Sequence, residues 1–158
     1  MTNKFALSSN YFKEPSVAKW ESALFAGITD VELGLLHDCD TESILVKAQK
    51  DYNLLVTCGM NVSSVHLPFG KDWDISMKDN FKHEDALQKL RELIDWMSDK
   101  EIGIAVLHAS AEPISDDERA RRLLYAIETI EILGDYSKAR GVSLAVENLP
   151  RTCLGNSV

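Results

Sequence analysis

The chain has 158 residues, a net charge of −8 from 17 Lys and Arg against 25 Asp and Glu, and 45% hydrophobic residues. This composition predicts one soluble globular domain, residues 1–158, and its acidity disfavours nonspecific binding to nucleic acid or anionic lipid. There is no apolar run of membrane length and no secretory leader pattern at the N-terminus, so the expected location is the cytoplasm.

Short apolar runs alternate along the chain with amphipathic segments. The runs predict strands at residues 4–7, 30–36, 62–66, 102–108 and 142–147. Between them we expect helices that begin after Pro15, near Thr41, near Phe81 and at Ser115, and three of them end before a glycine.

Each helix is expected to bury one apolar stripe against the strands. The predicted inner positions are Val17, Trp20, Leu24 and Phe25 in the first helix, Ile44, Leu45, Ala48 and Tyr52 in the second, Leu87, Leu90, Ile94 and Met97 in the third, and Leu123, Ile127 and Ile130 in the fourth.

The last run, residues 142–147, is apolar almost without alternation, which is typical of a parallel strand covered on both faces. Strict alternation of strand and helix predicts an α/β fold, either an open doubly wound sheet or a (β/α)8 barrel. No glycine-rich phosphate motif follows a strand, which counts against a nucleotide-binding open sheet.

A titratable residue stands near the end of four of these strands: Glu32, His66, His108 and Glu147. The carboxyl ends of parallel strands meet at one edge of a sheet, so these side chains are candidates for a common site. A buried carboxylate such as Glu147 needs a metal, a base or a wet pocket beside it. The histidines could instead be satisfied by neighbouring backbone, and Glu32 could line a pocket or pair with a lysine or arginine.

The long loop at residues 68–80 is a candidate ligand-covering segment. In it Trp73 could stack on a sugar ring or serve as a hydrophobic plug. Arg151, just beyond Glu147, could bind a phosphate or carboxylate of a substrate. His83, at the start of a charged helix, is expected on the solvated surface, and Cys39, Cys58 and Cys153 lack disulfide or zinc spacing and are expected as reduced thiols.

Four segments together resemble the sugar phosphate isomerase/epimerase superfamily of xylose isomerase-like barrels, whose relatives include endonuclease IV-type enzymes. They are Phe25-Ala26-Gly27-Ile28 with Asp30-Val31-Glu32, Ser64-Val65-His66-Leu67-Pro68, Val106-Leu107-His108, and Leu144-Ala145-Val146-Glu147-Asn148. The resemblance implies a (β/α)8 TIM barrel, which needs roughly 250 residues, so about four and a half β/α units are expected here, as the N-terminal portion of a longer barrel.

The resemblance also implies a divalent metal ion, with Mn, Mg, Co and Zn as candidates. In the isomerases and epimerases the metal is held by carboxylates and a histidine from strands five to eight. Glu147 matches the strand-five member, as ligand or as catalytic base, and Asn148 beside it is grouped with the substrate-binding residues. In endonuclease IV-like members histidines after strands three and four join that glutamate around zinc, and His66 and His108 match those positions.

Three functions follow as hypotheses. The first is a metal-dependent sugar or sugar-phosphate isomerase or epimerase, expected to be incomplete and inactive without strands six to eight. The second is a zinc phosphodiesterase acting on abasic DNA, which the acidic charge disfavours, since the basic cluster at residues 119–122 should lie outside the barrel. The third is a non-catalytic half-barrel or binding module. Expected partners are a small sugar and, through open sheet edges, a second copy of the chain.

Overall fold

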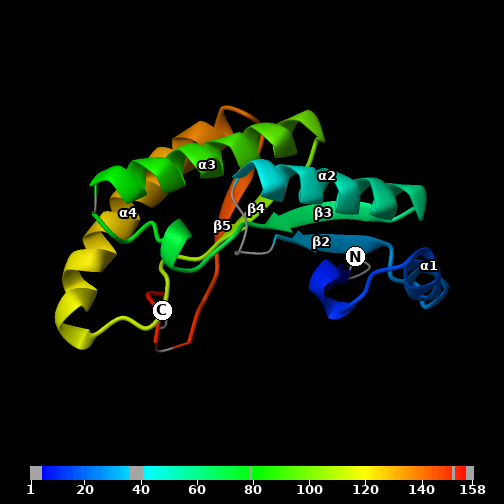
Figure 1. The fold of residues 1–158 in the computed structure, drawn as a ribbon, viewed down its shortest axis with the longest axis horizontal. Coiled ribbons are helices and arrows are strands. Elements are labelled where there is room, and N and C mark those ends of the chain that lie inside the picture. The colour runs from blue at the N-terminus through cyan, green and yellow to red at the C-terminus, as the bar shows by residue number, and fades with distance from the viewer. Residues whose placement is uncertain (1–4, 36–40, 79, 151, 156–158) are drawn as a thin grey trace.

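Five parallel strands form one sheet in the order of the chain, β1-β2-β3-β4-β5 (Figure 1). The structure is a computed structural model that describes residues 5–35, 41–78, 80–150 and 152–155. The strands are β1 (Ala6–Ser8), β2 (Asp30–Gly34), β3 (Asn61–His66), β4 (Ile104–Leu107) and β5 (Ser143–Val146). The predicted α/β fold with a parallel sheet is therefore confirmed.

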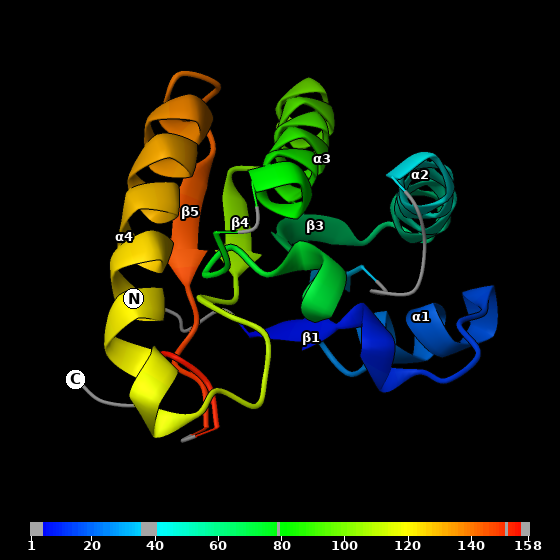
Figure 2. The ribbon, with the colours of Figure 1, turned by 60° about the vertical axis from the view of Figure 1, so that its left-hand side comes forward.

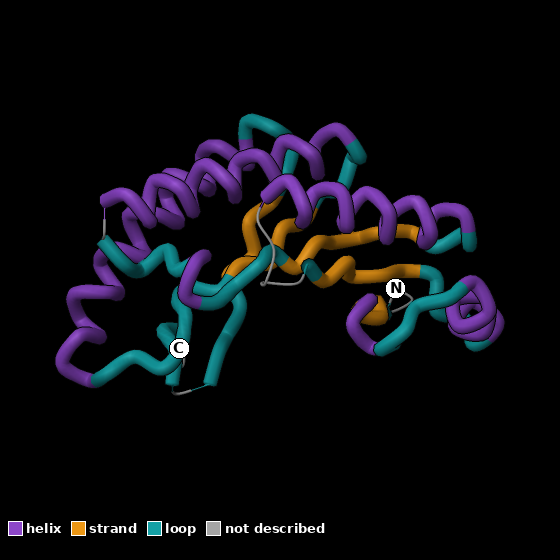
Figure 3. The backbone as a smooth tube through the Cα atoms, in the orientation of Figure 1, coloured by secondary structure: helices purple, strands orange, loops and turns teal. Residues whose placement is uncertain are grey.

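Four helices connect successive strands, and two short 3-10 turns lie in the loops after β1 and β3. The helices are α1 (Val17–Phe25), α2 (Thr41–Thr57), α3 (Asn80–Asp99) and α4 (Asp116–Lys138), and the turns are η1 (Ser9–Tyr11) and η2 (Lys71–Trp73). Figure 3 shows α2 and α3 running across one face of the strands, and Figure 2 shows α4 alongside β5. None of the described helices is both long and apolar enough to cross a membrane.

The main core lies between the strands and the helices. Side chains alternate across a strand, so Val31 and Leu33 of β2, and Val65 of β3 with the following Leu67, are fully buried in this layer. The strand register pairs Glu32 with Ser64 and Gly34 with His66, which places these residues on the other face of the sheet. That second face leads to the carboxyl edge where the candidate site lies.

The inner stripe predicted for α3 is confirmed, since Leu87, Leu90, Ile94 and Met97 are all buried in the core. The prediction for α1 is partly wrong. Trp20 is buried, but Val17 and Phe25, the first and last residues of the helix, are 46% and 96% exposed.

The prediction for α4 is wrong for Leu123 and Ile127, which are each 45% exposed, whereas Ile130 does pack against the core. The helix instead buries a neighbouring stripe of Arg122, Ala126, Thr129 and Leu133. Two of these residues have buried polar partners: Arg122 pairs with Asp74, and the Thr129 hydroxyl donates to the Ile75 carbonyl (3.1 Å).

The prediction that residues 142–147 are covered on both faces is also wrong. In the described structure β5 pairs only with β4, so it is an edge strand, and Ser143, Ala145 and Val146 are exposed. Val142, just before the strand, is buried in the core.

Candidate metal centre

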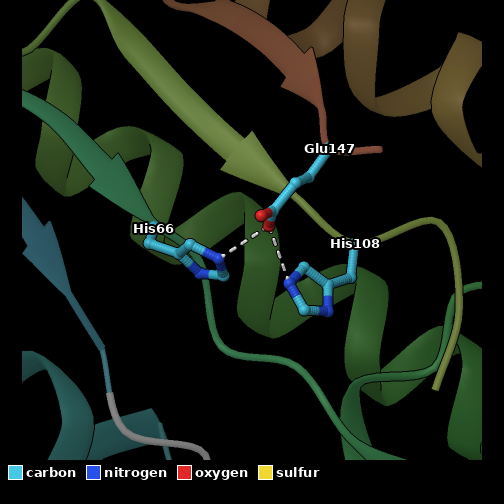
Figure 4. A group of neighbouring side chains, drawn as sticks. All are labelled: His66, His108 and Glu147. Atoms are coloured by element: carbon cyan, nitrogen blue, oxygen red, sulfur yellow. Dashed lines mark hydrogen bonds and ion pairs between the residues drawn. The ribbon is translucent and has the colours of Figure 1, made fainter. Parts of the chain in front are cut away.

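Three titratable side chains converge at the carboxyl edge of the sheet. His66 is the last residue of β3, and His108 and Glu147 directly follow β4 and β5. Figure 4 shows the two imidazole rings facing the carboxylate, with each residue coming from its own strand. The parallel register of β3, β4 and β5 brings these positions together, although they lie far apart in the sequence.

One carboxylate oxygen lies close to both imidazoles. Glu147 Oε2 is 3.1 Å from His66 Nε2 and 2.9 Å from His108 Nε2, and the three ligand atoms all lie within 4.8 Å of one another. The histidines are largely buried, whereas the Glu147 side chain is 42% exposed and remains accessible to a ligand.

The hydrogen bonding of His66 is compatible with either a proton or a metal ion between its Nε2 and Glu147. Nδ1 of His66 lies 2.9 Å from the Leu67 carbonyl oxygen, which can only accept, so we assign the proton to Nδ1. In neutral His66 the Nε2 lone pair then faces the Glu147 oxygen, another acceptor. Two acceptors at this distance require a proton or a metal ion between them. Two imidazole nitrogens and a carboxylate oxygen are a ligand set of catalytic zinc sites.

His108 is suited to bind a metal because burial, together with the nearby His66, holds its pKa below the ordinary value, against the opposing effect of Glu147. A lower pKa keeps the imidazole neutral, the form that binds metals.

Two groups near the cluster were missed by the sequence predictions. The Phe69 ring stacks on the His108 ring at a centroid distance of 4.2 Å. Glu112, in the loop after β4, accepts hydrogen bonds from the Thr152 hydroxyl (2.6 Å) and the Cys153 thiol (3.4 Å), which hold its pKa below the usual value. In the sequence, the only feature that pointed to Phe69 was its position three residues after His66.

The loop after β5 is attached to the loop after β4. The Ile114 amide donates to the Thr152 carbonyl (2.8 Å), and the Leu154 amide donates to the Ser110 hydroxyl (2.9 Å). These contacts anchor the segment that follows Glu147.

The other predicted site residues that the structure describes are not members of this cluster. Glu32 is half-buried and forms no ion pair with any described residue. Asn148 is exposed beside Glu147. Trp73 is only 4% exposed and belongs to the core, so the structure favours the hydrophobic plug and does not support stacking on a sugar. Arg151 lies outside the described residues.

The three arginines of the basic cluster in α4 have partners within the fold. Arg122 is buried against Asp74, Arg121 pairs with Glu118, and Arg119 donates to the Cys153 carbonyl (2.6 Å). His83, predicted on the solvated surface, is half-buried, with Nε2 lying 3.4 Å from the Thr129 hydroxyl. The prediction for His83 is therefore wrong, since packing of α3 against α4 covers it.

Comparison with models of protein families finds no match, and comparison with curated protein sequences finds none either. Solved structures do match. D-psicose 3-epimerase from Clostridium cellulolyticum H10, solved with D-tagatose, matches with a TM-score of 0.73 and 13% identity over 95% of this chain and 54% of that chain. The apo form of 3-keto-D-glucoside 4-epimerase from E. coli matches with a TM-score of 0.70 and 12% identity, over 96% and 58%.

D-allulose 3-epimerase from Methylomonas sp., in complex with D-allulose, matches with a TM-score of 0.69 and 19% identity, over 96% of this chain and 53% of that chain. The chain thus spans about half the length of the solved structures it matches. At these identities the likeness concerns the fold. The chain has the fold of the xylose isomerase-like sugar isomerase and epimerase barrels, over about half of their length.

Proposed function

We propose that this chain carries part of the metal-dependent active site of a sugar or sugar-phosphate isomerase or epimerase, an enzyme that moves a proton at the carbon next to a carbonyl. The observation that carries the proposal is the convergence of His66, His108 and Glu147 at the carboxyl edge of the sheet. Active sites of barrels of this fold lie at that edge. The similarity to sugar epimerases supports the choice of a sugar as substrate.

In this proposal His66 and His108 hold a divalent ion through Nε2, and Glu147 holds it through Oε2. A bound ion would polarise the carbonyl or hydroxyl oxygens of a sugar. The two imidazoles favour a zinc-like ion over Mg²⁺, which prefers oxygen ligands. The partly exposed Glu147 carboxylate is also the candidate to accept the proton from the sugar carbon.

A zinc phosphodiesterase acting on abasic DNA is the second candidate, because two histidines and a glutamate suit zinc. The charge of the chain opposes it. The net charge of −8 disfavours binding to a polyanion, and the arginines of the basic cluster, Arg119, Arg121 and Arg122, all have partners within the fold. The isomerase or epimerase therefore remains the better-supported function.

The experiment begins with metal binding. Equilibrium dialysis with Zn²⁺, Co²⁺ or Mn²⁺ should give one ion per chain, and Glu147→Gln should bind far more weakly. Loss of a group that merely supports a ligand already costs about 10–100-fold in affinity, so loss of the ligand itself should cost more. Glu118→Gln, a surface change in the Arg121 pair, is the matched control and should bind as the unaltered chain does.

The second step tests proton transfer. The metal-loaded chain is incubated with D-fructose or D-tagatose in D₂O, and NMR follows the loss of the C–H signal next to the carbonyl. Exchange that needs metal and Glu147 would support the proposal. A metal-loaded chain that cleaves abasic DNA without exchanging any ketose proton would favour the phosphodiesterase. Metal binding without either activity would fit an incomplete active site or a binding module, and would argue against turnover by this chain alone.

A further inference from the structure

The two histidines of the cluster are held in different ways. His66 is held at Nδ1, the ring nitrogen that does not face Glu147, because Nδ1 donates a hydrogen bond to the Leu67 carbonyl (2.9 Å). Among the described residues, no comparable hydrogen bond reaches Nδ1 of His108; the contacts of its ring are Glu147, His66 and Phe69. Metal-binding histidines normally have such a bond, because it orients the ring.

Phe69 occupies the face of the His108 ring. The two ring centroids are 4.2 Å apart with an interplanar angle of 23°, a stacked arrangement. Phe69 also meets His66 edge to face at 5.5 Å, and the two imidazoles lie 4.9 Å apart at 72°. The three rings therefore pack as one group, in which a rotation that tilts the His108 ring out of its plane would break the stack.

We propose that Phe69 is a positioning residue for His108, whose stacked ring aims Nε2 at Glu147 and the proposed metal in place of the missing hydrogen bond. Aromatic stacking is directional, so it can set a ring plane as well as exclude water. The inference rests on the metal-binding part of the proposed function and not on the reaction. Phe69 acts through His108 and needs no contact with a substrate.

The surroundings of Phe69 indicate what a smaller side chain would change. Phe69 also lines a cavity of about 420 Å³, together with Asn10, Trp20 and Leu54. A leucine at position 69 would keep an apolar side chain but lose the flat face, and His108 would gain room to turn toward this cavity.

The test compares Phe69→Leu with Phe69→Tyr, which keeps the ring. The matched control is Phe81→Leu, since Phe81 is largely exposed at the start of α3. The first readout is NMR of the metal-free chain: ring stacking should shift the carbon-bound protons of His108 upfield in the unaltered chain and in Phe69→Tyr, but not in Phe69→Leu. Far-UV circular dichroism verifies that each variant folds.

The second readout is the binding of Co²⁺. Phe69→Leu should weaken binding by about 10–100-fold, the effect of losing a group that orients a metal ligand, and should change the visible d–d spectrum. Phe69→Tyr should retain the Co²⁺ affinity and the d–d spectrum of the unaltered chain, and Phe81→Leu should change neither the affinity nor the spectrum.

Wild-type affinity and spectrum in Phe69→Leu would overturn the inference and leave the proposed function standing. Absence of the upfield shift in the unaltered chain would overturn it as well, without any variant. Metal binding that depends on Phe69 but gives no ketose exchange would support the inference and argue against turnover by this chain alone. An unaltered chain that binds no Co²⁺ would refute both.

Discussion

The ion pair between Asp74 and Arg122 is the interaction whose loss should destabilise the fold most clearly. Their side chains are only 6% and 8% exposed. Asp74 follows η2, and Arg122 lies on the buried stripe of α4, so the pair joins the loop after β3 to that helix. Ser76 completes the network: its amide (3.0 Å) and hydroxyl (2.6 Å) donate to Asp74 Oδ1, and Arg122 Nε donates to the hydroxyl (3.0 Å).

The change Asp74→Asn leaves the buried guanidinium without a counter-charge. Removing one partner of a buried pair costs about 3–5 kcal/mol, and since asparagine keeps the shape and one acceptor, we expect the lower end, about 3 kcal/mol. For a chain of this length each kcal/mol lowers the melting temperature by about 2–4 °C, so the expected fall is about 6–12 °C.

Urea unfolding followed by circular dichroism measures the loss. The matched control is Asp51→Asn, which breaks the more exposed pair with Lys47 and should cost less than about 1 kcal/mol. Adding Arg122→Met to Asp74→Asn removes the stranded charge, so the double variant should be more stable than Asp74→Asn alone. A cost of Asp74→Asn as small as that of the control would refute the reasoning.

Three further predictions concern His108, α4 and Cys153. The pKa of His108 is lowered in the fold, so the stability that His108 contributes is complete above its unfolded pKa, about 6.5, and is lost as the pH falls through the lower folded pKa. Urea unfolding of the metal-free chain across this pH range should show that loss of stability, and the His108→Gln variant should not. Leu133→Ala, at a fully buried position of α4, should lower the free energy of unfolding by about 2–5 kcal/mol, whereas Leu124→Ala, at an exposed position, should change it by no more than about 0.5 kcal/mol. Equal losses in the two variants would contradict the observed buried face of α4. Cys153 is buried, and burial raises the pKa of its thiol, so it should react with a disulfide reagent only after unfolding. Rapid labelling of Cys153 in the native chain would contradict this buried position.

The order and type of the elements could be read from the sequence because local patterns carry them. In α3 the positions Leu87, Leu90, Ile94 and Met97 repeat at the helical period, with charged residues between them, so only one face could be buried. The strands are short apolar runs, and strict alternation with helices leaves a parallel sheet as the outcome. His66, His108 and Glu147 became candidates in the same way, since each stands at a strand end.

The buried face of α4 could not be read locally. Its sequence offers two stripes, one with Leu123 and Ile127 and one with Arg122 and Thr129. Burial of the second stripe requires a partner for Arg122, and that partner is Asp74, which lies more than 40 residues earlier in the chain. The apolar periodicity predicted the first stripe because hydrophobic spacing takes no account of polar partners elsewhere in the chain.

Strand period, helix period and strand-end position are local properties, so they were enough to predict the parallel α/β architecture and to select His66, His108 and Glu147 as candidates. Three features appear only in the folded chain: one oxygen of Glu147 meets both imidazoles, Phe69 stacks on His108, and Trp73 is buried in the core. Contacts of this kind depend on the register between strands and on the paths of loops. Those are set by packing between segments far apart in the chain, which no local pattern records.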